Sequence, residues 1–172
     1  MSTGAETTTS TAGWYELARR AAAGGEGGAE GASRRQLLCF AVDGAPYAVA
    51  VESVREIVRI RPITPIPRVA RDVRGVISLR GEIIQVIDLR LRLGLPPCEI
   101  TKATRIVVVH VDDGRVAGLL VDGVQEVLRI SEDAIGPAAT GDAQGVVASL
   151  CARGGQFVSL LDLERALDLT NA

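Results

Sequence analysis

Short apolar segments separated by turn residues run through the chain from Gln36 onward. Two pairs of these segments each flank an Asp-Gly dipeptide. The first pair is Leu37 to Val42 with Ala45 to Val51, and the second is Arg105 to Val111 with Arg115 to Val121. An Asp-Gly pair between two apolar runs is typical of a β-hairpin with a two-residue turn. The pattern therefore predicts two similar hairpins, one in each half of the chain.

A second kind of strand pair follows each hairpin. Gly75 to Leu79 and Glu82 to Ile87 turn at Arg80-Gly81, while Val146 to Leu150 and Gln156 to Leu161 turn at Arg153-Gly154-Gly155. Asp88 and Asp162 then precede short leucine patterns, and aspartate favours the N-cap of a helix. Gly94 stands where the first helix should end. Each half thus offers four or five short strands, enough for a small closed barrel but too few for a stable open sandwich.

The two halves also repeat in sequence. Val51 to Ile60 recurs 70 positions later as Val121 to Ile130, with five of ten residues identical. Gly81 to Leu89 likewise resembles Gly155 to Leu163. We infer a duplicated unit of roughly 60 to 70 residues, covering about 36–95 and 104–170, with a linker from Gly94 to Ala103. Two segments differ between the copies. No residue in a similar sequence context corresponds to Arg80 in the second copy, and Pro62 to Pro67 aligns with the dissimilar Ser131 to Gly136. Function is expected where the copies differ.

Composition limits the size and location of the fold. The 172 residues suit one ordinary domain or two very small ones with a shared core, and 47% hydrophobic but only 3% aromatic residues predict a core of Val, Ile, Leu and Ala. No apolar run approaches the roughly 18 to 20 residues that span a bilayer, and no secretion signal is evident. With three cysteines outside any CxxC spacing, a reducing cytoplasm is expected.

Residues 1–34 differ from the rest in being rich in Thr, Ser, Ala and Gly. We expect a disordered arm. Within it, Trp14, Leu17, Ala18 and Ala21 fall at helical spacing and fit either a short docking helix or a frayed tail. The ordered domain is expected to cover residues 35–172.

Charge is unevenly distributed although the net charge is only −2. Residues 55–92 contain nine Arg against four acids, a balance of +5, and residues 111–172 contain ten acids against four Arg, a balance of −6. Most of these side chains are expected to form solvated faces. The asymmetry also predicts docking through complementary fields, including weak head-to-tail self-association.

Catalytic chemistry is not expected. His110 is the single histidine and has no His or Cys partner at metal-ligand spacing, and Lys102 is the single lysine, so neither a catalytic triad, a metal site nor a P-loop is predicted. Asp88 and Asp162 suit helix caps, and Asp122 opens a turn. We predict a protein that is not an enzyme and has no cofactor. A small basic barrel that binds nucleic acid is a weaker alternative, because few aromatic side chains are available for stacking.

A protein-binding surface is the remaining possibility. Arg61 to Pro67 contains three prolines and is expected to be extended, with Ile63 and Ile66 either projecting from it or lying over the core. Arg80 stands at a predicted hairpin tip, and a pair with Glu56 would place a charged feature beside an exposed Val54.

Several motifs in order resemble the CheW-like chemotaxis coupling proteins over about residues 36–170. They are Tyr47 to Ile57, Ile63 to Pro67, Arg74 to Arg90 and Gly118 to Val124. The resemblance implies an all-β fold of two intertwined five-stranded barrels of the Src-homology-3 type with short helices, one barrel being circularly permuted through strand exchange. It also implies a non-enzymatic cytoplasmic adaptor, recruited to receptor clusters at the inner membrane. Such an adaptor joins the regulatory domain of the histidine kinase CheA to the cytoplasmic tip of chemoreceptors.

The resemblance further implies which residues bind each partner. Val51, Val54, Ile57 and Ile106 would form the receptor groove, Gly75 and Gly118 would let a receptor helix approach, and Glu56 with Arg80 would be the charged pair beside it. The loop with Ile63 and Ile66 would contact the kinase. Gly136-Pro137 and Gly141 replace a basic and an aromatic residue that accompany a second kinase contact, so ring formation is left open. A non-flagellar circuit, for gliding, twitching or development, fits the same residues.

Overall fold

The computed structural model describes residues 33–138 and 145–169. Strands dominate these residues, and the helices are single turns. The predicted all-β class with short helices is therefore confirmed. The predicted N-terminal arm falls outside the described residues apart from Ser33 and Arg34, and so does Gly141.

The two halves share most of their element order, but the 3-10 turn precedes the third strand in the first half and follows it in the second, which also has one additional strand. The first half contains β1 (Arg34–Val42), β2 (Ala45–Ala50), η1 (Val51–Ser53), β3 (Val54–Arg59), β4 (Val73–Leu79), β5 (Glu82–Asp88) and α2 (Leu89–Arg92). The second half contains β6 (Arg105–His110), β7 (Val116–Val121), β8 (Gly123–Ser131), η2 (Glu132–Ala134), β9 (Ile135–Pro137), β10 (Val147–Arg153), β11 (Gln156–Leu161) and α3 (Leu163–Ala166). The repeated ten-residue sequence forms η1 with β3 in one copy, and the last residue of β7 with nearly all of β8 in the other.

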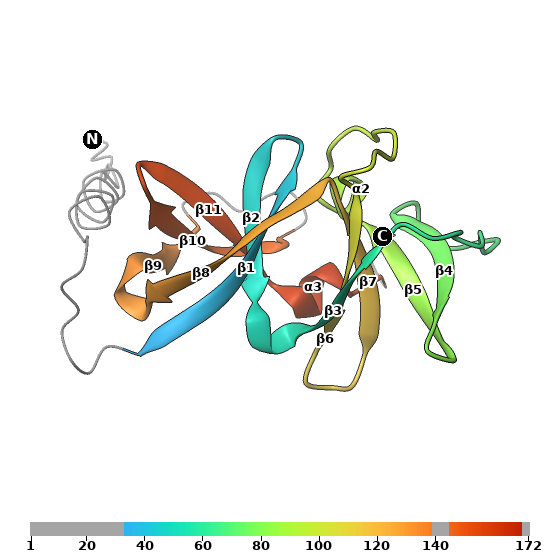
Figure 1. Cartoon of the computed structure of the whole chain (residues 1–172), viewed down its shortest axis with the longest axis horizontal. Helices are drawn as coiled ribbons and strands as arrows, with labels where there is room; N and C mark the ends of the chain where they lie inside the picture. The colour runs from blue at the N-terminus through green and yellow to red at the C-terminus, as the bar shows by residue number, and fades with distance from the viewer. Residues whose placement is uncertain (1–32, 139–144, 170–172) are drawn as a thin grey trace, which may run out of the picture.

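The two halves exchange their first hairpins. One sheet has the order β8-β1-β2-β11-β10-β9 and the other β3-β6-β7-β5-β4, so each combines strands from both repeats (Figure 1). When β6 to β8 are matched with β1 to β3, and β10 and β11 with β4 and β5, both sheets have one order, 3-1-2-5-4. The five-stranded sheet is contiguous in sequence from β3 to β7, as a circular permutation requires. The predicted intertwining thus takes the form of a hairpin swap.

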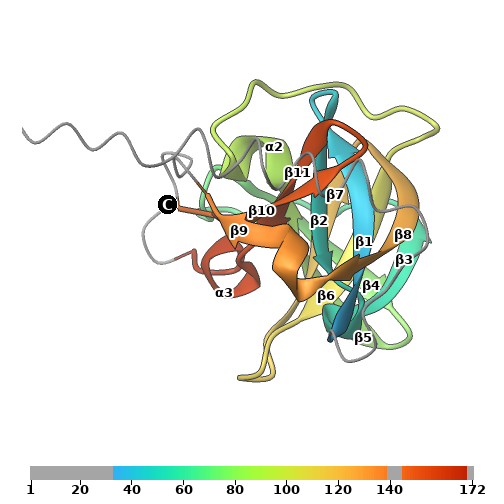
Figure 2. The same ribbon diagram turned by 90° about the vertical axis from the view of Figure 1, so that its left-hand side faces the viewer.

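Both sheets close on themselves, but by different amounts of pairing. After β3, Thr64 exchanges two backbone hydrogen bonds of 2.9 Å with Val76 of β4 and forms an isolated bridge. After β8, the chain pairs with β10 over three residues and forms β9 (Figure 2). The second barrel therefore has six strands, where five were predicted. Pro62 and Pro65 flank Thr64 closely and lack the N–H groups that a longer ladder needs.

The hairpin turns differ in a way that sequence pattern alone did not predict. Asp43 and Gly44 have φ of 53° and 74°, as a two-residue type I′ turn requires. Asp113-Gly114 instead lies in a longer loop, because Asp113 Oδ1 accepts a hydrogen bond from the Arg115 backbone N–H at 2.9 Å. β6 consequently ends at His110 and β7 begins at Val116, one residue short of the prediction on each side.

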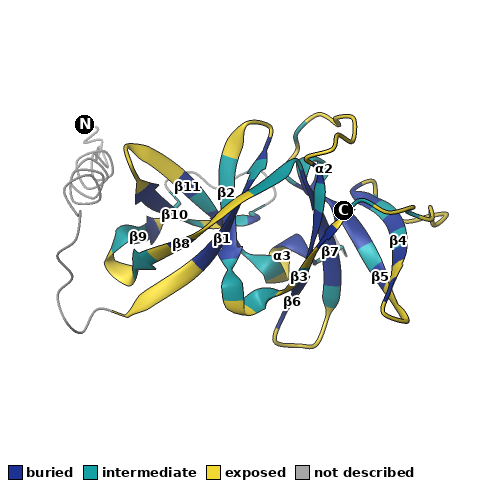
Figure 3. Cartoon of the chain, in the orientation of Figure 1, coloured by how far each residue is buried: buried dark blue, intermediate teal, exposed yellow. Residues whose placement is uncertain are grey.

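Continuous apolar runs mark the strands that are buried on both faces (Figure 3). In β6, Ile106 and Val108 fill the five-stranded barrel, whereas Val107 and Val109 enter a core shared by both barrels. In the same way Leu37 and Cys39 of β1 fill the six-stranded barrel, and Leu38 and Phe40 enter the shared core. The shared core also includes Leu89 of α2 and Ala166 of α3. These three cores account for the run of β-branched residues in the central strands.

Polar contacts fix the helices and join the repeats. Asp88 accepts a hydrogen bond from the Arg90 backbone at 3.0 Å, and Asp162 caps α3 in the same way, as predicted. The Arg90 side chain pairs with Asp122 at 2.6 Å and with Asp43 at 3.1 Å. Arg90 holds the pKa of Asp122 below its ordinary value by hydrogen bonding. This cluster joins α2, the β1–β2 turn and the start of β8, so it ties the exchanged hairpin in place.

Candidate protein-binding site

Strand β3 carries the exposed part of the predicted receptor surface. Ile57 is 41% exposed, whereas Val51 and Val54 are half-buried and pack against the shared core. β3 lies at one end of its sheet order and pairs only with β6 within that sheet. It therefore presents an apolar side chain and its outer edge together.

Glu56 and Arg80 form the predicted ion pair. Arg80 Nε donates to Glu56 Oε1 at 3.1 Å and Nη2 donates to Oε2 at 3.4 Å, and this pairing raises the pKa of Arg80. A second pair, Arg55 with Glu82 at 2.7 Å, lies on the other side of the same turn. Because β3 and β4 are the two ends of the sheet order, these contacts hold the β4–β5 hairpin tip against β3.

Arg80 has an unusual backbone conformation. Its φ is 51°, in the left-handed region that favours glycine, and Gly81 follows with φ of 81°. The matching turn in the second half has Gly154 and Gly155 at φ of 52° and 79°. The first copy therefore keeps a large side chain at a position where the second copy has glycine. An observed backbone outlier of this kind points to a role for the side chain.

The charged pair itself is duplicated, contrary to the prediction that Arg80 has no counterpart. Arg153 donates through Nη2 to Glu126 Oε2 at 2.7 Å. Glu126 occupies the position in β8 that Glu56 occupies in β3, and Arg153 lies one residue before the glycine that matches Arg80. Alignment of the copies missed this because the arginine has moved by one position along the turn.

Three other predicted receptor residues lie inside the five-stranded barrel. Ile106 has no exposed surface. A Cβ on Gly118 would meet the Ile106 Cγ2 methyl at 2.5 Å, and a Cβ on Gly75 would meet the Thr64 carbonyl oxygen at 2.1 Å. Contacts within the chain thus account for both glycines. Gly75 permits the barrel to close at Thr64, and the three residues support the surface from beneath rather than form it.

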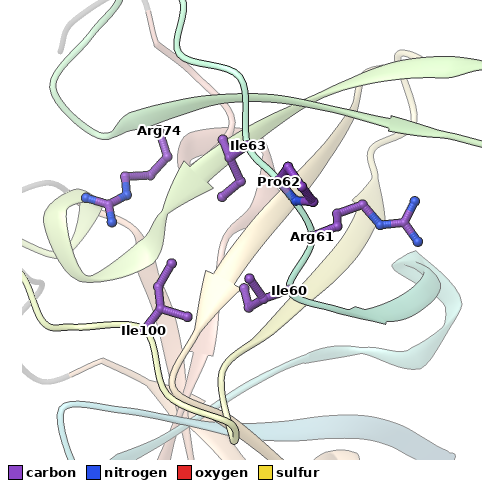
Figure 4. A pocket seen from close by; sticks show the side chains of 6 residues that line it. All are labelled: Ile60, Arg61, Pro62, Ile63, Arg74 and Ile100. Carbon is purple, nitrogen blue, oxygen red and sulfur yellow. The ribbon is translucent and has the colours of Figure 1, made fainter.

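The loop after β3 borders a cavity of about 540 Å³ (Figure 4). Six residues line it: Ile60, Arg61, Pro62, Ile63, Arg74 and Ile100. Ile63 is half-buried and packs against the five-stranded barrel core, whereas Ile66 is 36% exposed. Of the two predicted alternatives, lying over the core therefore holds for Ile63, and projecting from the loop holds for Ile66. Ile100 was missed in the sequence because it lies in the linker, where no periodic pattern marks it.

The remaining candidates for chemistry have structural positions. Asp88 and Asp162 are helix caps, Asp122 pairs with Arg90, and His110 is exposed at the end of β6. Over residues 33–138 and 145–169, no group of three or more His, Cys, Asp or Glu side chains is placed to hold a metal ion. The same residues include no helix that is long and apolar enough to cross a membrane.

Comparison with known proteins gives a consistent result. Residues 36–171 match the model of the CheW-like domain. The chain is 34% identical over 136 residues to the chemotaxis protein CheW of Bacillus subtilis (strain 168), covering 77% of this chain and 86% of that protein. It is 40% identical over 103 residues to CheW of Rhizobium meliloti (strain 1021), covering 60% and 66%. The crystal structure of the scaffolding protein TtCheW from Thermoanaerobacter tengcongensis superposes with a TM-score of 0.75 at 29% identity, covering 81% of this chain and 97% of that one.

Proposed function

The chain belongs to the CheW-like domain family and is a chemotaxis coupling adaptor, and we propose that it joins the regulatory domain of a CheA-type histidine kinase to the cytoplasmic tip of a chemoreceptor. It acts by binding alone, with no cofactor. The duplicated barrel supports this proposal, because its repeated residues build turns, caps and core strands.

The receptor surface consists of Val54, Glu56 and Ile57 on β3, with Val51 beside them and Arg80 at the hairpin tip. Ile57 offers exposed apolar area that an amphipathic receptor helix would cover. The Glu56–Arg80 pair borders it, and Arg80 keeps most of its side chain in solvent, where it is 74% exposed. A strained arginine that remains this exposed is the single observation that carries the assignment.

The kinase surface consists of Ile63 and Ile66 on the loop between β3 and β4. Prolines remove backbone donors from this loop and keep it extended. Thr64 anchors its centre to Val76, so Ile66 projects from a fixed segment. Rigid presentation lowers the entropy cost of binding a partner.

Both surfaces belong to the five-stranded barrel and are connected through it. Thr64 bonds to β4, and Arg80 at the tip of β4 bonds to β3. A receptor and a kinase that bind these surfaces are thereby held in a defined relative geometry, and a receptor state that prefers one geometry biases the kinase. The adaptor is cytoplasmic and is recruited to receptor clusters at the inner membrane by these contacts.

A pull-down with the full-length chain as bait tests the proposal. We expect a histidine kinase and a chemoreceptor to be recovered together, with Arg80→Glu reducing the receptor and Ile66→Glu reducing the kinase. Val127→Glu is the matched control, because Val127 is 51% exposed on β8 of the other barrel. Recovery of neither partner by the unchanged chain would sink the adaptor assignment, and equal loss with all three variants would sink the two surfaces.

A further inference from the structure

We propose that the cavity beside Ile63 is the specificity pocket of the kinase surface, and that it binds a partner segment in which an apolar side chain is flanked by carboxylates. The proposal rests on the adaptor function and names the chemistry that one of its surfaces recognises. It adds Ile60, Arg74 and Ile100 to the residues that contact the partner.

The apolar part of the cavity comes from two separate segments of the chain, residues 60–63 and the linker. Ile60 follows β3, Pro62 and Ile63 belong to the loop, and Ile100 reaches in from the linker between the repeats. Ile100 is 44% exposed, and Ile63 is only half-buried. The hollow is open to solvent, and its volume of about 540 Å³ leaves room for a large side chain of a partner laid across it. Covering these side chains would remove apolar surface from water.

Two guanidinium groups extend on opposite sides of this apolar floor. Figure 4 shows Arg74 leading away on one side and Arg61 on the other. Arg61 donates to the Ser78 carbonyl at 2.9 Å, which fixes its direction, and Arg74 lies 3.7 Å from Asp88 with 35% of its side chain exposed. Arginine at each edge favours carboxylates on both sides of the bound apolar residue.

The surrounding charges agree with an acidic partner. Two exposed basic residues are next to the lining residues in sequence: Arg59 immediately precedes Ile60, and Lys102 follows Ile100 by two positions. Of the nearby acids, Asp72 and Asp88 are buried and paired with arginines, which leaves Glu99, next to Ile100, as the exposed one. A basic rim around an apolar centre selects against basic or neutral segments and speeds encounter with acidic ones.

Site-specific cross-linking tests which segment enters the cavity. The photoreactive residue p-benzoylphenylalanine replaces Ile100 in the full-length chain, and the complex with the regulatory domain of the kinase from the same organism is irradiated and mapped by mass spectrometry. We expect attachment within a kinase segment that has an apolar residue with Asp or Glu within two positions. Attachment to a segment without acids, or no attachment although the complex forms, would overturn the proposal and leave the adaptor function intact.

Affinity measurements provide an independent check. Ile100→Ala should weaken kinase binding about tenfold, whereas Val127→Ala on the other barrel should leave it unchanged. Arg61→Gln should reduce the dependence of affinity on salt. Thermal unfolding verifies that each variant is folded. Equal affinities of Ile100→Ala and Val127→Ala would also overturn the pocket, and failure of the unchanged chain to bind the kinase would overturn the adaptor function and the pocket together.

Discussion

Arg80 combines a strained backbone with an exposed, paired side chain. Its φ of 51° costs roughly 1 kcal/mol relative to glycine, as estimated for left-handed residues. The second copy avoids this cost with Gly154 and takes its arginine from the preceding position, where Arg153 still reaches Glu126. Stability of the fold therefore does not require arginine at position 80, and its presence there favours a role in binding a partner.

Arg80→Gly separates stability from function. We expect the free energy of unfolding to stay within about 1 kcal/mol of the unchanged protein, because relief of backbone strain offsets the loss of an exposed ion pair. Receptor-dependent control of the kinase should fall by about fivefold or more, as for loss of a coupling interaction. Urea unfolding and a kinase assay measure the two effects, and unchanged control at normal protein levels would contradict the assignment.

Gly75 shows the opposite case, in which the residue type is required by the fold. Any Cβ there would lie 2.1 Å from the Thr64 carbonyl oxygen, and φ is 139°. The barrel closes at this contact, so an added methyl group pushes the loop with Ile63 and Ile66 away from β4.

Gly75→Ala should therefore destabilise the protein by about 1–3 kcal/mol, the range for overpacking, plus the backbone strain. Gly81→Ala is the matched control, because Gly81 also has positive φ but no heavy atom lies within 4 Å of its added Cβ. Denaturant unfolding should show a clearly larger loss for Gly75→Ala. Equal losses would mean that backbone strain, not the contact with Thr64, explains the glycine.

The sequence pointed to some site residues and not to others for identifiable reasons. Glu56 and Arg80 could be singled out because one lies in a repeated motif and the other in a turn signature, and their pairing came from the family resemblance. Ile100 could not be found, because its place over the cavity depends on the path of an irregular linker. The burial of Ile106 also depends on packing between strands that are not adjacent in sequence.

At the scale of elements, the hairpin exchange explains why the strands were predictable and their partners were not. Alternation and turn residues are local, so eight strands and both helix caps could be placed, with strand ends within three residues of those observed. The pairing of β2 with β11 and of β7 with β5 is parallel and joins segments far apart in sequence, so the local sequence of these strands does not predict it. Each barrel consequently contains strands from both sequence repeats.

Cutting the chain between residues 98 and 99 tests the exchange. The first fragment keeps β1 and β2 without β8 and β11, and β3 without β6, so we expect no cooperative unfolding from either fragment alone. Mixing the two fragments should restore a folded complex, because each supplies the missing strands. Circular dichroism during urea titration reports both results. Cooperative folding of residues 1–98 alone would instead favour two independent barrels.

At the scale of the whole molecule, the two halves share some surface features and differ in others. Each barrel has a charged pair, Glu56–Arg80 in one and Glu126–Arg153 in the other, and an exposed aliphatic residue, Ile57 or Val127. The loops after β3 and β8 differ. The proline-rich first loop bonds to β4 at Thr64 and borders a cavity, whereas the second pairs with β10 over three residues as β9. The duplication thus builds a common scaffold, and the two copies differ most clearly in these loops.

A reconstituted kinase assay tests the central claim most directly. Purified kinase and receptor-containing vesicles are combined with or without the full-length chain, and the rate of kinase autophosphorylation is measured before and after addition of the receptor's ligand. The account predicts a ligand-dependent change of about fivefold or more only when the chain is present, and none with Arg80→Gly. The same ligand response without the chain, or no response although the chain binds both partners, would contradict it.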